Sequence, residues 1–374
     1  MEKAVAYLPL HGGRAPKWLF RRMVLLAEGI LTVIAEEYGR AEVLRRFADP
    51  AWFQAFSCVL GYDWHSSGTT TVTCGAVKEA LKRADIGIKV AGGKGKAALK
   101  APEEIVSISD EFSLSWAKTK RLIYSSKMSA KVDNAVLQDG YKIYHHAFMM
   151  AEDGRWVVIQ QGMNPEIRYA RRYHWLGDDV QSFVNEPHNA IVCNAMMKLV
   201  LDMRARESEE ARKTSLDLAL EKPEKLRKYV LAIKKPWQTT IEQWVGDGIR
   251  KDNISVGGVA KELFMPWNIN WKALKKVYDF QPKNYEELIA IEGIGPSTVR
   301  ALAYISSLIF GAETSWKDPV KYSFAVGGKD GVPKPVDRIA MDDAIRILRE
   351  GIEKAKLGDK ERINAIKRLK RLVP

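Results

Sequence analysis

The sequence predicts an α+β protein, and three observations support that prediction. Aromatic and β-branched residues fill two runs at 141–162, as in a β-hairpin. Apolar residues recur at helical spacing through much of the remaining chain. A stretch rich in Lys, Arg and Glu at 204–235 has the composition of exposed helices. We therefore expect a mixed N-terminal domain with a small sheet at 1–205, a charged helical bridge at 206–282 and a C-terminal helical domain at 283–374.

The first hundred residues are predicted to be mainly helical. One helix should run from Pro16 to Gly39, since proline suits a first helical turn and glycine a helix end. A second is expected at 41–47, and the apolar segment 51–60 should be buried. Residues 61–73 read as a polar loop and 75–83 as a helix.

The sheet should begin at 86–90, a β-like run that ends in the glycine-rich segment AGGKGKA. A helix is expected at 130–138, with Gly140 ending it. The hairpin at 141–162 should turn at Glu152-Asp153-Gly154, because Asp-Gly favours tight hairpin turns. From 190 to 280 the pattern is helical.

Charge and composition narrow the functional class. The 59 Lys and Arg exceed the 46 Asp and Glu, for a net charge of +13, which favours a polyanionic partner. No apolar run reaches the roughly 18 residues of a membrane span, and the N-terminus lacks the apolar core of a signal peptide. The three cysteines are scattered, which fits a reducing cytoplasm.

Residues 288–302, LIAIEGIGPSTVRAL, resemble the helix-hairpin-helix motif, in which a Gly-hydrophobic-Gly turn joins two short helices. Such glycines let the backbone approach a phosphate, and the amides at the start of the second helix point at the anion. An ordinary glycine turn between core helices is the alternative. The residues expected to grip DNA here are Gly293, Ile294, Gly295, Ser297, Thr298 and Arg300.

Two further segments could contact a nucleic acid. Residues 168–175, RYARRYHW, interleave cations with aromatic rings, so Arg168, Arg171 and Arg172 are candidate DNA contacts. The alternative is a packed helix with buried arginine stems. The tail 351–374 has a net charge of +5, and a solvated helix face would explain it equally well.

The N-terminal region carries residues suited to phosphodiester hydrolysis. A metal-dependent nuclease needs carboxylates or imidazoles around Mg²⁺ or Mn²⁺, together with cations that stabilise charge. The candidates for catalysis are Asp63, His65, Lys94, Lys131, Asp133, Asp139 and His145. The metal ligands among them would be Asp63, His65, Asp133 and Asp139. His145 and His146 should face opposite sides of a strand, so at most one of them can join a given site.

The loop at 316–343 indicates a different class of enzyme. Asp337 and Arg338 follow the glycine turn and faintly resemble the catalytic aspartate region of glycosylases that carry the same hairpin. The interval is longer than in those enzymes, and no lysine occupies their lyase position. A DNA glycosylase or abasic-site lyase using Asp337 is therefore the second hypothesis.

Several strings across the chain are similar to a prokaryotic family catalogued as domain of unknown function 763. They are LPLHGGRAPKWLF, DPAWFQAFSCVLGYDWHSSGTTT, GGKGKA, KVDNAVLQDGYKIYHH, VVIQQGM, RYARRYHWL and KDPVKYSFAVGGKDGVPKPVDR. The resemblance implies a large N-terminal domain paired with a helix-hairpin-helix. It implies an activity on DNA, most simply that of a nuclease, and identifies no catalytic residue.

The sequence therefore predicts a cytoplasmic DNA-processing enzyme, most simply a metal-dependent nuclease, that binds DNA through a helix-hairpin-helix. A non-catalytic DNA-binding protein and nucleotide binding at the Ser/Thr-rich loop near residue 68 are further alternatives. The long helices suggest a homodimer.

Overall fold

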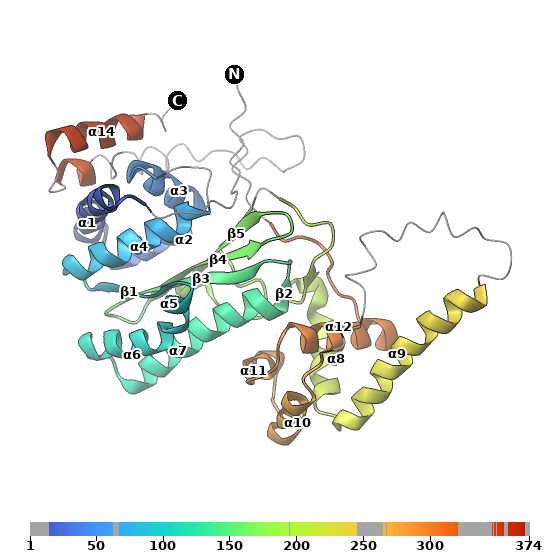
Figure 1. The fold of residues 1–374 in the computed structure, drawn as a ribbon. Helices are drawn as coiled ribbons and strands as arrows, with labels where there is room; N and C mark the ends of the chain where they lie inside the picture. The colour runs from blue at the N-terminus through green and yellow to red at the C-terminus, as the bar shows by residue number, and fades with distance from the viewer. Residues whose placement is uncertain are drawn as a thin grey trace.

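A computed structural model gives the architecture of the chain (Figure 1). The structure describes residues 15–62, 67–193, 195–244, 265–266, 268–320, 346, 348, 350–354 and 358–370. It confirms an α+β fold in which helices cover both faces of a central antiparallel sheet.

The central sheet has five strands in the order β1-β3-β4-β5-β6, all antiparallel. Their bounds are β1 Ile88–Lys94, β3 Lys142–Ala151, β4 Trp156–Asn164, β5 Tyr169–Leu176 and β6 Ala190–Val192. A second, two-stranded sheet pairs β2 (Leu137–Gln138) with β7 (Leu201–Asp202). The predicted hairpin is confirmed: β3 and β4 flank a turn at which Gly154 has a φ of 91°.

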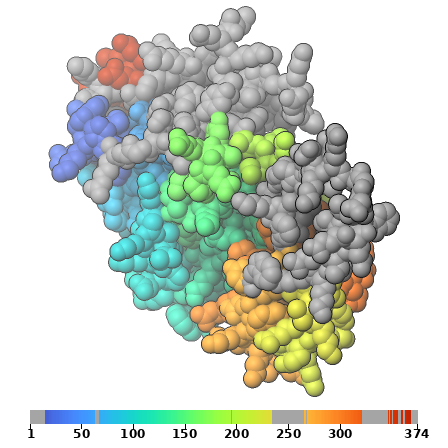
Figure 2. All heavy atoms as spheres, turned by 45° about the vertical axis from the view of Figure 1, so that its right-hand side comes forward, coloured from blue at the N-terminus to red at the C-terminus, as the bar shows by residue number. Residues whose placement is uncertain are grey.

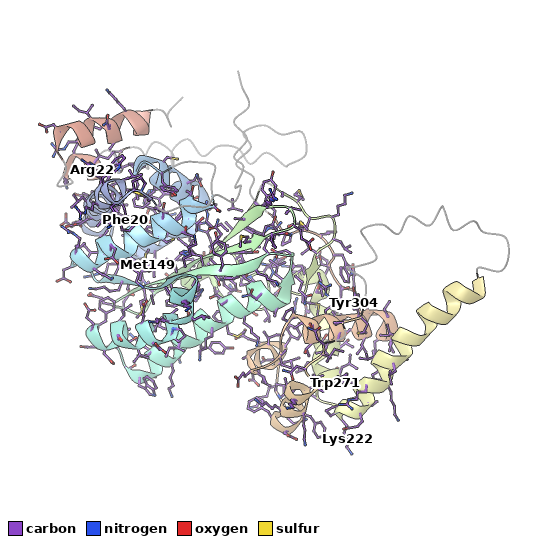
Figure 3. The ribbon with its side chains drawn as sticks, viewed as in Figure 1. Phe20, Arg22, Met149, Lys222, Trp271 and Tyr304 are labelled. Atoms are coloured by element: carbon purple, nitrogen blue, oxygen red, sulfur yellow. The ribbon has the colours of Figure 1, made fainter. Side chains whose placement is uncertain are left out.

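One face of the sheet is covered by the N-terminal helices. They are α1 Lys17–Tyr38, α2 Arg40–Ala48, α3 Pro50–Val59 and α4 Gly68–Arg83. Gly39, with a φ of 84°, ends α1 as predicted, and Asp49 caps α3 by accepting from the amides of Ala51 and Trp52. The expected loop at 61–73 is wrong from Gly68 onward, where α4 begins. Met149 lies on the sheet among the buried apolar residues of this layer (Figure 3).

The other face is covered by a second helical layer. It comprises α5 Lys96–Leu99, α6 Ala101–Glu111, α7 Trp116–Lys131 and a π-helical turn, η1, at Val132–Val136. The predicted helix at 130–138 therefore contains only the end of α7, then η1 and strand β2. A π-turn widens the backbone, and this one carries Asp133 into the core beneath the sheet.

The C-terminal helices pack on the same side as α7. Their bounds are α8 Glu209–Ala219, α9 Pro223–Trp244, α10 Trp271–Phe280, α11 Tyr285–Ala290 and α12 Pro296–Phe310. Two short 3-10 turns, η2 Gly177–Asp179 and η3 Arg206–Ser208, lie in the connections. Buried Phe148 of the sheet, Leu288 of α11 and Leu302 of α12 belong to one continuous apolar cluster, so these two helices share a core with the sheet. Trp271 and Tyr304 mark this region in Figure 3.

The two segments that could contact a nucleic acid, residues 168–175 and the basic tail, are positioned differently from the sequence prediction. Residues 168–175 lie mostly in strand β5, so the packed-helix alternative is wrong. Helix α14 (Asp359–Lys370), in the basic tail, packs on α3 beside the N-terminal helices, well away from α11 and α12 (Figure 1). The charged residues of α14 therefore do not flank the glycine turn.

Candidate functional site

Polar side chains form a row across the sheet on the face toward α1–α4. The register places Lys94 opposite His145, His145 opposite Gln161, and Gln161 opposite Arg172. Directly paired residues project to the same face, so four polar side chains from four strands stand side by side. The structure thus brings two of the predicted catalytic residues, Lys94 and His145, together.

His145 is the least satisfied member of this row. Its side chain is 1% exposed, and neither ring nitrogen has a hydrogen-bond partner among the residues that the structure describes. The Nε2 of Gln161 also lacks a partner, whereas its Oε1 accepts from the Tyr144 hydroxyl at 3.0 Å. Each unpaired buried polar group costs about 1–3 kcal/mol, and such groups mark places that bind water, an ion or a substrate.

The electrostatic setting keeps His145 neutral. Burial, with His146 and Lys94 nearby, lowers the pKa of His145 to about 3. Exposed Lys94 holds its ammonium 5.9 Å from the centre of the Tyr144 ring. Because His145 is buried and so weakly basic, Lys94 is the member of the row that a bound anion could contact. Asp63 and His65 lie outside the described residues, in the segment that leads to Ser67 and the start of α4.

Asp133 lies on the opposite face, in a fully bonded network. Its two oxygens accept from Gln160 Nε2 at 2.7 Å, Trp175 Nε1 at 3.1 Å and His188 Nε2 at 2.5 Å. Burial raises the pKa of Asp133 to about 8, against the opposing effects of Arg204 and the Trp175 N–H.

The network extends on both sides of Asp133. Arg204 donates to His188 Nδ1, so His188 must carry its proton on Nε2. Arg204 also forms an ion pair with Asp202 at 2.9 Å. On the other side, Gln160 Oε1 lies 3.0 Å from His146 Nδ1, and His146 Nε2 lies 2.8 Å from the Ser126 hydroxyl. His188 belongs to no motif, so nothing in the chain around it predicted a role in this network.

Asp139 belongs to a second buried network. It pairs with Arg171 at 2.9 Å and accepts from the Tyr173 hydroxyl at 2.7 Å. Arg171 also pairs with Asp318 at 2.7 Å. This ion triad fixes the segment after α12 against the sheet.

These contacts decide which residues could hold a metal ion. The oxygens of Asp133 and Asp139 are occupied by donors, and both residues face away from His145. Within the described ranges, no group of three or more His, Cys, Asp or Glu residues could hold a metal ion. The described residues therefore do not fit Mg²⁺ or Mn²⁺, and Asp133 and Asp139 do not converge with Lys94 and His145.

The three arginines of the cation-aromatic segment differ in accessibility. Arg171 and Arg172 are fully buried, which removes them from any surface that DNA could touch. Arg172 reaches His174 at 2.9 Å and stacks over Phe53, with its guanidinium carbon 4.4 Å from the ring centre. Arg168 is exposed in the β4–β5 turn, at a φ of 57°.

The glycine turn joins α11 to α12. Gly293 has a φ of 90°, and a Cβ there would lie 2.9 Å from Asn270 Nδ2 and 3.0 Å from Ala273 Cβ. Only glycine suits this close approach of α10 to the turn. Ile294 is buried in the core, and the Thr298 side chain is 2% exposed, so the backbone rather than these side chains is available to a ligand.

Helix α12 begins at Pro296 with Gly295 as its N-cap, and no side chain caps it. The amides of Ser297 and Thr298 have no acceptor within the helix, because the first helical bond there runs from Val299 to Gly295. The Ser297 hydroxyl donates to Asn268 at 2.8 Å. The start of a 15-residue helix thus presents backbone donors beside an exposed Gly293.

Two cations that were functional candidates, Lys131 and Arg300, make structural contacts instead. Lys131, which was expected to be catalytic, donates from Nζ to the Ile291 carbonyl at 3.2 Å, and burial lowers its pKa. Arg300 donates to Gln138 at 2.7 Å, on the side toward β2. Near the turn, Lys276 of α10 pairs with Glu292 at 3.8 Å, and Lys272 and Lys275 are also exposed on this helix.

The fold and these two sites define an α+β protein with a row of polar side chains across its sheet and an exposed glycine turn between two helices. A family model described as "Protein of unknown function (DUF763)" matches residues 4–336, and the chain belongs to this family. No curated protein matches the chain, and no solved structure does. Among the described helices, none is long and apolar enough to cross a membrane.

Replacing His145 by glutamine should change how stability depends on pH. The folded wild type keeps His145 neutral down to about pH 3, whereas the unfolded chain protonates it near 6.5. The unfolded state therefore binds the extra proton as pH falls through this window, and the wild type loses stability. Between pH 7 and 5 the wild type should lose about 2 kcal/mol more than H145Q, measured by urea unfolding.

Gln161→Leu is the matched control, because it changes the same row without removing a titrating group. Its stability should follow the wild-type pH dependence. Parallel curves for H145Q and the wild type would show that His145 titrates alike in the folded and unfolded chain.

Proposed function

We propose that this protein binds DNA with the α11–α12 hairpin as a helix-hairpin-helix, and that it is a DNA-processing enzyme, most simply a nuclease. The observation that carries the binding part is the start of α12. Its Ser297 and Thr298 amides have no helical acceptor, and the Gly293 turn beside it is exposed.

The surroundings of the turn favour a phosphate backbone. Lysines 272, 275 and 276 lie on α10, and α10 packs directly against Gly293. Exposed Glu292 pairs loosely with Lys276 at 3.8 Å, a contact that a phosphate can replace at little cost. Contacts from amides and lysines grip the backbone without reading the base sequence, so binding should be tolerant of sequence and sensitive to salt.

The enzymatic part rests on exposed Lys94, whose ammonium can stabilise the charge that develops on a phosphate during phosphodiester hydrolysis. His145, paired opposite Lys94 in the sheet, is buried and neutral, so it is part of the support of this site and does not contact DNA. A divalent metal remains part of this proposal through Asp63 and His65, which lie outside the described residues. Asp133 and Asp139 act in it as structural groups.

One gel assay tests the nuclease proposal. Labelled single-stranded, duplex and branched DNA are incubated with Mg²⁺, with Mn²⁺ or with EDTA. We expect phosphodiester cleavage that EDTA abolishes and that Lys94→Met slows by roughly 100-fold, as the loss of one charge-stabilising group does. Gln161→Leu and a melting curve for each variant control for folding.

Two outcomes would replace the nuclease with another function. DNA of every structure that is bound but left intact would favour the non-catalytic DNA-binding alternative. Metal-independent release of damaged bases, lost in Asp337→Asn, would favour the glycosylase alternative. Asp337 lies outside the described residues.

A further inference from the structure

Helix α7 carries an exposed surface without acidic residues. Its 16 residues, WAKTKRLIYSSKMSAK, contain five cations and no Asp or Glu. Of these cations, Lys118, Lys120, Arg121 and Lys127 are exposed. Trp116, at the start of the helix, is 61% exposed, which is unusual for so large an apolar ring. This surface is distinct from the sheet row and from the α12 amides.

The cations and the indole form one stripe along the helix. At 100° per residue, Trp116, Lys120 and Lys127 fall within about 40° of one another, and Lys131 lies about 60° from Trp116. The Lys120 ammonium lies 5.9 Å from the centre of the Trp116 ring. We call these four residues the α7 stripe.

The α7 stripe leads directly to the hairpin. Lys131 Nζ donates to the Ile291 carbonyl in the turn, and Tyr124 of α7 donates to Glu286 of α11 at 2.9 Å. Figure 2 shows the teal surface of this layer adjoining the orange surface of the C-terminal helices. The rise of a helix places Trp116 about 22 Å from Lys131, a span that covers several nucleotides.

We infer that the α7 stripe binds single-stranded DNA that continues from a duplex held at the hairpin. The cations complement a phosphate backbone, and an exposed indole can stack on a base only where that base is unpaired. A duplex end would expose such bases, whereas an intact duplex would offer only its phosphates. This inference rests on the proposed function and names its substrate: DNA with a single-stranded extension.

The test compares two DNAs by fluorescence anisotropy: a blunt duplex, and the same duplex with a tail of about ten nucleotides. We expect the tailed duplex to bind more tightly than the blunt one. Trp116→Ala should weaken binding of the tailed duplex by roughly tenfold and leave blunt binding unchanged, since one stacked base is lost. The double variant Lys120→Ala/Lys127→Ala should also weaken tailed binding.

Trp18→Ala is the matched control. Trp18 is 60% exposed on α1 and has Arg22 at 5.6 Å, so it repeats the Trp-cation pair on the opposite side of the sheet. It should leave both affinities unchanged. Equal affinities for blunt and tailed DNA, or a Trp116→Ala effect no larger than that of Trp18→Ala, would overturn the inference while leaving hairpin binding intact. Failure of both DNAs to bind would overturn the proposed function as well.

Discussion

Replacing Gly295 by aspartate is expected to weaken duplex DNA binding by at least about tenfold without destabilising the fold. Gly295 is the N-cap of α12, its φ is −121°, and an added Cβ would meet no atom within 4 Å. Aspartate is a favoured N-cap whose carboxylate bonds the first amides of a helix. The same carboxylate would occupy the donors offered to a phosphate and repel it, which costs affinity.

Asn284→Asp is the control for Gly295→Asp. Asn284 caps α11 by accepting from the Glu287 amide at 2.8 Å, so this substitution adds the same charge to the hairpin and keeps a cap. Fluorescence anisotropy with a blunt duplex should give near wild-type affinity for N284D and a large loss for G295D, with both variants melting at or above the wild-type temperature. Equal losses would mean that general repulsion, rather than the α12 amides, controls binding.

Replacing Arg171 by methionine should lower the free energy of unfolding by about 3–5 kcal/mol, because two buried carboxylates would lose their cation. The side chains of Arg171, Asp139 and Asp318 are at most 1% exposed, and the two ion pairs measure 2.9 and 2.7 Å. Tyr141 adds a stacking contact, with its ring centre 4.4 Å from the guanidinium carbon. Chemical unfolding measures the loss.

Arg168→Met removes the same charge from the exposed turn before β5. It should change stability by less than about 0.5 kcal/mol, as most surface substitutions do. If R171M were as stable as R168M while losing DNA affinity, Arg171 would be a DNA contact, as its sequence context suggested, and the buried triad would be wrong.

Local patterns predicted the elements whose signals lie close together in the chain. The Asp-Gly turn and its aromatic arms identified the β3–β4 hairpin, and Pro16 with Gly39 bounded α1. The alternation of strand side chains correctly separated His145 from His146. These features depend on neighbours within a few residues, which the sequence shows directly.

The polar networks could not be read in this way. In β5 both faces are buried, so the alternation of polar and apolar residues that identifies a strand is absent. Arg171 and Arg172 look like surface cations until their partners are known, and those partners are remote: Asp318 for Arg171 and Gln54 for Arg172. Asp133 was a metal candidate for the same reason, since the Trp175 and His188 donors come from other elements.

Equilibrium binding of the full chain to a labelled blunt duplex, repeated over a range of salt concentrations, tests the central claim most directly. Backbone binding through amides and lysines predicts affinity that is independent of base sequence and falls linearly with salt on logarithmic axes, with a slope near −3 if about three lysines displace counterions. G295D should bind more weakly at every salt concentration. A wild-type chain that shows no affinity for DNA at low salt would contradict the account.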